Sequence, residues 1–120
     1  MKQVAGLKVL VVEDEGLVAL MIEGMLEDLG FEVVASVSRL ADARTIAAKA
    51  DVDLAVLDVN LAGEPSFSIA EVLRGRQIPF IFSTGYGLSG LPDEFAHQPL
   101  IGKPFSKEEL QQTIAAALSS

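Results

Sequence analysis

The chain has 120 residues, half of them hydrophobic, and carries a formal net charge of −8. This length suits one domain with one core, and the negative charge argues against direct binding to nucleic acid or to anionic membranes. It contains no cysteine, which excludes disulfides and thiolate chemistry, and it has no long apolar segment, so we expect a cytoplasmic protein that spans no membrane. The whole of 1–120 is expected to form a single domain, with a core of about 6–118 and no output domain.

Short runs rich in β-branched and aromatic residues alternate with segments of helical spacing. Five strands are predicted, at Lys8–Val12, Phe31–Ala35, Leu54–Leu57, Phe80–Phe82 and Leu100–Ile101. The first helix is expected to end at Gly30. Its predicted apolar stripe consists of Leu17, Leu20, Met21, Met25 and Leu26.

Further helices are expected around Leu40–Ala47, Ile69–Leu73 and Leu110–Leu118. Ser106 and Glu109 have the spacing of a capping box at the start of the last one. The segment 85–98 is rich in Gly and Pro and is the poorest helix of the set.

This alternation predicts an α/β, flavodoxin-like (βα)5 domain with three layers. Its parallel five-stranded sheet should have the order 2-1-3-4-5, with helices on both faces. The topological switch point then lies between strands one and three, and functional residues should lie at the C-terminal ends of these strands.

Three carboxylates follow the first and third strands, namely Glu13, Asp14 and Asp58. Like charges this close raise one another's pKa or require a cation, and oxygen ligands favour Mg²⁺ or Mn²⁺. We expect Asp14 and Asp58 to hold the ion directly, Glu13 to hold it through a water, and the backbone carbonyl of Asn60 to complete the protein's share.

Two further strand ends supply a hydroxyl and an ammonium group, Thr84 and Lys103. Together with the metal they suit phosphoryl transfer to Asp58, because both groups stabilise the oxygens of the transferring phosphoryl group. Each residue alone also fits an ordinary turn, helix cap or solvated side chain. Their joint occurrence at four strand ends favours the chemical interpretation.

The set Glu13-Asp14, Asp58, Thr84 and Lys103-Pro104-Phe105 resembles the response-regulator receiver domains of two-component systems. The resemblance covers about 6–118 and implies a phosphoacceptor signalling domain that is not an enzyme, beyond slow self-dephosphorylation. It also implies a sensor histidine kinase or histidine phosphotransfer protein as donor, a downstream protein target, and a monomer or weak phosphorylation-dependent dimer. Pro104 is the candidate for a cis peptide bond.

The chain departs from the usual receiver pattern at Leu100, where receivers generally have an aromatic switch residue. The segment Pro79–Gly87 is similar to a subgroup of stand-alone receivers with a Phe-Ala-Thr-Gly-Tyr motif, with Ser83 in place of the alanine. The switch candidates are therefore Thr84, Tyr86 and Leu100. We expect phosphorylation to act through a change of order in the segment between Thr84 and Pro99.

The predicted function is a stand-alone response regulator that is phosphorylated on Asp58 and signals by altered protein–protein interaction. An alternative is a phosphate shuttle or sink in a phosphorelay, which the sequence does not separate from the first. A remote alternative is an aspartate-nucleophile phosphatase, which requires a second acid at the position of Asn60.

Overall fold

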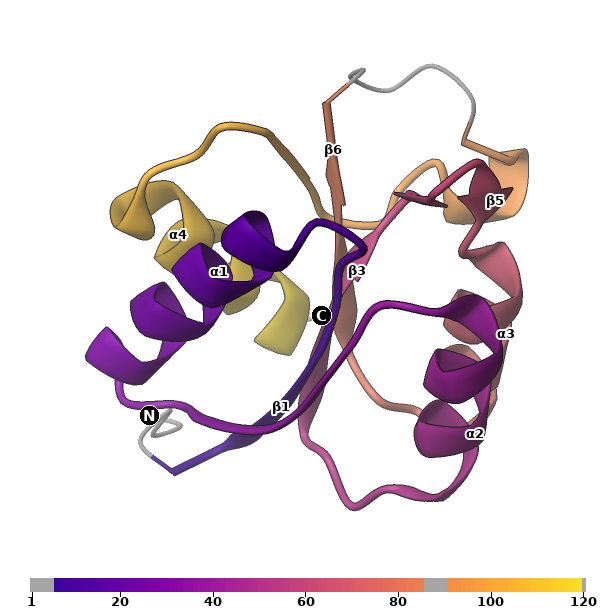
Figure 1. Cartoon of the computed structure of the whole chain (residues 1–120), viewed down its shortest axis with the longest axis horizontal. Coiled ribbons are helices and arrows are strands. Elements are labelled where there is room, and N and C mark those ends of the chain that lie inside the picture. The colour runs from indigo at the N-terminus through magenta and orange to yellow at the C-terminus, as the bar shows by residue number, and fades with distance from the viewer. Residues whose placement is uncertain (1–5, 86–90, 120) are drawn as a thin grey trace.

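A five-stranded parallel sheet forms the centre of the computed structural model, which describes residues 6–85 and 91–119 (Figure 1). The strands follow the order β2-β1-β3-β6-β7, which in chain order is the predicted 2-1-3-4-5. The elements are β1 (Lys8–Val12), α1 (Gly16–Asp28), β2 (Glu32–Val37), α2 (Leu40–Lys49), β3 (Leu54–Asp58), β4 (Asn60–Leu61), β5 (Glu64–Pro65), α3 (Phe67–Gly75), β6 (Phe80–Thr84), the 3₁₀ helix η1 (Asp93–Phe95), β7 (Leu100–Gly102) and α4 (Lys107–Leu118).

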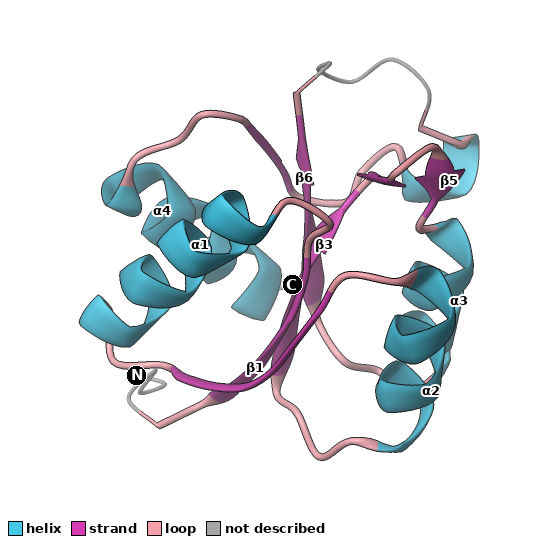
Figure 2. Cartoon of the chain, viewed as in Figure 1, coloured by secondary structure: helices cyan, strands magenta, loops and turns pink. Residues whose placement is uncertain are grey.

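Helices cover both faces of the sheet: α1 and α4 lie on one side, α2 and α3 on the other (Figure 2). All residues of β3 and β6 are buried, because strands enclosed on both faces have no solvent side. One core contains Ile22, Leu26 and Leu110 from α1 and α4, and the other contains Ala43 and Ile69 from α2 and α3. The predicted α/β class and three-layer arrangement are confirmed.

The apolar stripe predicted for α1 is correct at its C-terminal end, where Leu26 is buried and Met25 packs half-buried against the core, and wrong for the other three residues. Leu17 and Leu20 are 84% and 64% exposed, and Met21 is exposed with them. Ala19 and Ile22 are buried beside Leu26 in their place. Because α1 is apolar around most of its circumference, helical spacing alone does not identify the face that packs on the sheet.

The ends of the helices agree with the local sequence signals. Ser106 and Glu109 form the predicted capping box of α4, with the Ser106 side chain accepting from the Glu109 N–H. Gly30 follows α1 with a φ of 95°, a conformation that glycine adopts without steric cost.

In place of a full fourth helix, the described part of the segment after β6 contains only η1, three residues long. The Gly- and Pro-rich composition of this segment explains why a longer helix does not form in that part.

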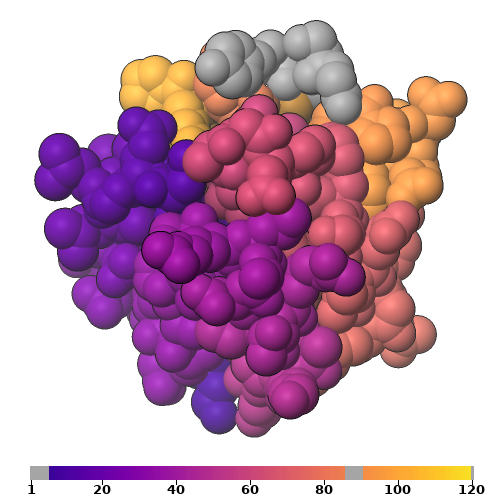
Figure 3. Space-filling model, turned by 45° about the vertical axis from the view of Figure 1, so that its right-hand side comes forward, coloured from indigo at the N-terminus to yellow at the C-terminus, as the bar shows by residue number. Residues whose placement is uncertain are grey.

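The sequence does not predict the short hairpin that β4 and β5 form after Asp58. It turns through Ala62 and Gly63, which have φ values of 52° and 92°. In the space-filling view the surface of α2 faces the reader (Figure 3).

Four phenylalanines form an aromatic cluster between β6, α3 and η1. Phe67, Phe80 and Phe82 surround the buried Phe95, with ring centroids 5.8, 6.3 and 5.6 Å from its own. The Arg74 guanidinium lies 4.4 Å from the centre of the Phe95 ring, on which it makes a cation–π contact. The cluster thereby fixes η1 against α3.

Candidate functional site

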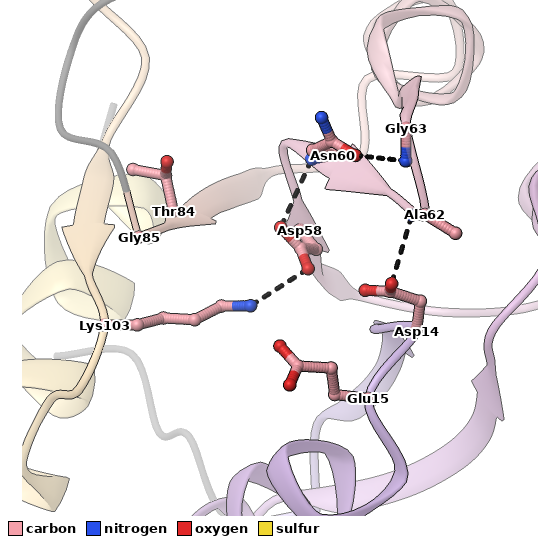
Figure 4. Close-up of a pocket in the computed structure, with 9 residues that line it drawn as sticks. All are labelled: Asp14, Glu15, Asp58, Asn60, Ala62, Gly63, Thr84, Gly85 and Lys103. Carbon is pink, nitrogen blue, oxygen red and sulfur yellow. Dashed lines mark hydrogen bonds and ion pairs between the residues drawn. The ribbon is translucent and has the colours of Figure 1, made fainter.

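A cavity of about 590 Å³ opens at the sheet edge where β1, β3, β6 and β7 end (Figure 4). Parallel strands bring their C-terminal ends to one edge, so residues distant in sequence meet there. The cavity is lined by Asp14, Glu15, Asp58, Asn60, Ala62, Gly63, Thr84, Gly85 and Lys103.

Lys103 is at the centre of the site. Its Nζ donates to Glu13 Oε1 at 2.7 Å and to Asp58 Oδ2 at 2.9 Å, and both carboxylates are buried. The backbone N–H of Lys103 donates to the Thr84 carbonyl at 2.8 Å, which aligns the ends of β6 and β7. The peptide bond between Lys103 and Pro104 is cis.

Burial and charge act in opposite directions on the pKa values of this pair. Burial raises the pKa of Glu13 to about 6, although hydrogen bonds from Lys103 and from the Glu15 N–H lower it. Burial also works against the charge of Lys103, but its hydrogen bonds to Glu13 and Asp58 prevail and raise its pKa above the ordinary value. The ammonium group therefore stays charged at neutral pH and balances the carboxylates.

The hairpin after Asp58 is attached to the carboxylates by backbone hydrogen bonds. The N–H of Ala62 donates to Asp14 Oδ2 at 3.0 Å, and that of Asn60 donates to Asp58 Oδ1 at 3.2 Å. The Asn60 side chain accepts from the Gly63 N–H at 2.6 Å and thus closes the turn. These contacts hold the turn at Ala62 and Gly63 over the site. Because Ala62 acts through its backbone, its side chain gives no sequence signal of this role.

The three acidic groups fit a divalent cation. Glu13, Asp14 and Asp58 each offer a carboxylate oxygen, and these oxygens lie within 4.8 Å of one another. Hard oxygen ligands of this kind suit Mg²⁺ or Mn²⁺. The structure thus brings together all three carboxylates singled out in the sequence, and Asn60 lines the same cavity.

The remaining residues singled out in the sequence are distributed unevenly. Thr84 is buried and lines the cavity. Leu100 pairs with Phe82 in the sheet and packs, half-buried, against the core on the α2 and α3 side. Tyr86 lies outside the described residues.

Comparison with known proteins gives a consistent result. The model of the response regulator receiver domain family matches residues 9–115. The transcriptional regulatory protein GltR of Pseudomonas aeruginosa is 35% identical over 122 residues, which cover 94% of this chain and 49% of GltR. The chain spans about half the length of the curated relatives it matches.

Two solved structures extend the similarity to the fold. SdrG from Sphingomonas melonis is 37% identical with a TM-score of 0.85, covering 98% of this chain and 99% of SdrG. The receiver domain of the sensor histidine kinase PA1611 from Pseudomonas aeruginosa is 29% identical with a TM-score of 0.81. That match covers 97% of this chain and all of the PA1611 domain, whose structure has a magnesium ion coordinated in the active site cleft. The chain therefore belongs to the response regulator receiver domain family of two-component systems.

Proposed function

We propose that this receiver domain accepts a phosphoryl group on Asp58 from a histidine kinase or histidine phosphotransfer protein, in a reaction that depends on Mg²⁺. The observation that carries the proposal is the placement of Lys103 between two buried carboxylates at the mouth of a cavity, 2.9 Å from Asp58. A lysine in that position offsets the charge of an incoming phosphoryl group.

Asp58 is the nucleophile of this reaction. One of its oxygens forms a bond to phosphorus while the bond between phosphorus and the donor's histidine nitrogen breaks, and the electron pair of that bond returns to the imidazole. Lys103 and the Thr84 hydroxyl stabilise the transferring oxygens. Asp14 and Asp58 would hold Mg²⁺ directly, Glu13 through a water, and Asn60 through its carbonyl. When bound, the ion neutralises charge on the phosphoryl oxygens. The magnesium ion coordinated in the active site cleft of the PA1611 domain supports a metal site in this cavity.

The exposed residues of α1 supply a contact surface for the donor protein. Glu15 lines the cavity, and Leu17, Leu20 and Met21 follow it within the first two turns of α1. A protein that brings a phosphohistidine to Asp58 has to cover the mouth of the cavity and therefore this apolar surface. Exposed apolar patches beside a reactive site are typical of protein interaction surfaces.

The output is altered binding of a protein partner in the cytoplasm. The segment after Thr84 transmits the change, because η1 is anchored to α3 through Phe95 and Arg74 while Thr84 lines the cavity. No helix in the described part of the chain is long and apolar enough to cross a bilayer.

The experiment that tests the proposal uses a donor without a protein surface. The chain is incubated with acetyl phosphate and Mg²⁺, and the mass increase of one phosphoryl group is measured beside Asp58→Asn. Wild type should gain the group only when Mg²⁺ is present, and the variant should not gain it. Equal modification of both proteins, or none in the wild type, contradicts the proposal.

A further inference from the structure

Ser83 carries a fully buried hydroxyl group that has no hydrogen-bond partner among the described residues. It lies in β6 after Ile81 and Phe82, which are also fully buried. Buried hydroxyls are normally paired, because an unpaired one loses its bonds to water without replacing them. An alanine at this position would avoid that cost, so the hydroxyl calls for an explanation.

The sheet places Ser83 directly beside Asp58. The two residues are register partners in the parallel strands β3 and β6, which lie about 5 Å apart. Side chains of register partners point to the same face of a sheet. On its other side Ser83 is paired with Ile101, two residues before Lys103. Ser83 therefore lies on the strand between β3, which ends in Asp58, and β7, which Lys103 follows.

We propose, on the basis of the function proposed above, that Ser83 becomes a hydrogen-bond donor to Asp58 Oδ2 once Asp58 is phosphorylated. In the structure Oδ2 accepts from Lys103, and Oδ1 accepts from the Asn60 N–H. A phosphoryl group on Oδ1 attracts the Lys103 ammonium, because it brings new negative charge into the cavity. Oδ2 then loses its donor. One of its two lone pairs would hold Mg²⁺, and the other accepts from the unpaired hydroxyl on the neighbouring strand.

This bond accelerates loss of the phosphoryl group. In hydrolysis a water oxygen bonds to phosphorus, the bond from phosphorus to Oδ1 breaks, and its electron pair returns to the Asp58 carboxylate. Both hydrogens of the water leave with inorganic phosphate. Negative charge therefore grows on Oδ2 toward the transition state. A hydrogen bond to this atom is stronger in the transition state than in the acyl phosphate. Ser83 shortens the lifetime of phosphorylated Asp58.

The test compares three variants after phosphorylation with acetyl phosphate and Mg²⁺ and removal of the donor. Ser83→Ala should lengthen the lifetime of the phosphorylated protein about five-fold, the effect of one hydrogen bond. Ser83→Thr keeps the hydroxyl and should restore the shorter lifetime. Ser66→Ala is the matched control, because the Ser66 hydroxyl is likewise buried and unpaired but precedes α3 on the other side of the sheet. Its lifetime should equal that of the wild type.

Stability separates this role from a structural one. Ser83→Ala removes an unpaired hydroxyl, so its melting temperature should equal or exceed that of the wild type while its lifetime changes. The inference is overturned if the lifetime of Ser83→Ala is unchanged or shorter, or if Ser66→Ala lengthens the lifetime equally. Either result leaves the proposed function standing. A wild type that gains no phosphoryl group on Asp58 overturns the inference together with the proposed function.

Discussion

Replacement of Lys103 by methionine tests the charge balance of the site. The variant keeps the length of the apolar stem and removes the ammonium group that Glu13 and Asp58 share. The Glu13 side chain is fully buried and that of Asp58 is 9% exposed, whereas that of Lys103 is 17% exposed. Removing one partner of a buried ion pair costs about 3–5 kcal/mol. Because Lys103 retains some solvent contact, we expect a loss of about 3 kcal/mol in the free energy of unfolding near neutral pH.

Urea denaturation without metal measures this loss, first at about pH 7.5 and then at about pH 5. At the lower pH the Glu13 carboxyl is largely protonated in the wild type, because its pKa is about 6. The wild type has then already lost most of the ion pair with Glu13, so the substitution should cost less. Mg²⁺ should stabilise Lys103→Met more than the wild type, since the cation meets the carboxylates without competition from an ammonium group.

Lys8→Met is the control. Lys8 pairs with Asp51 at 3.3 Å, but the side chains are 42% and 90% exposed, and such surface pairs contribute about 0–1 kcal/mol. A loss in Lys103→Met no larger than in Lys8→Met would refute the reasoning. So would a loss that stays the same at both pH values.

Three further outcomes are expected. The raised pKa of Glu13 means that its contribution to stability is complete below its ordinary pKa of 4.5 and is lost as the pH rises through about 6. Urea titrations should therefore show the wild type losing about 2 kcal/mol relative to Glu13→Gln across this window, and parallel pH profiles would contradict the assignment. Asp14→Ala should weaken Mg²⁺ binding at least ten-fold by calorimetry while leaving the fold intact, and unchanged affinity would remove Asp14 from the ligand set. Leu17→Ser should slow phosphotransfer about ten-fold or more when the donor is a histidine kinase that phosphorylates the wild type, and should leave the reaction with acetyl phosphate unchanged. Equal slowing with both donors would place the defect in the phosphorylation site and not in the contact with the kinase.

The strand ends were predictable from the sequence because two simple rules converge on them. Buried parallel strands appear as continuous apolar runs, as in Leu54–Leu57, and polar residues directly after such runs meet at one edge of the sheet. This reasoning selects Asp14, Asp58 and Lys103, which line one cavity in the structure. The hydrogen bonds of Lys103 to both buried carboxylates depend on distances that the sequence does not contain.

Other features depend on tertiary contacts that local patterns do not encode. The buried face of α1 contains the small residue Ala19 beside Ile22, whereas the larger Leu17 and Leu20 face solvent. A pattern based on residue size and apolarity therefore selects the wrong residues in the first two turns of α1, although it selects Leu26 correctly. The β4–β5 hairpin likewise depends on a positive φ at Ala62, a conformation that few non-glycine residues adopt.

The aromatic cluster around Phe95 also makes the domain easy to observe by NMR spectroscopy. Leu91 and Leu100 pack against the core that contains Phe80, Phe82 and Phe95. Ring currents displace the methyl resonances of leucines that lie over or beside phenyl rings, and the displacement changes when a ring tilts or moves. With one tyrosine and no tryptophan in the chain, optical signals from the core are weak. The methyl resonances of labelled leucines should therefore show how the core responds to addition of beryllofluoride.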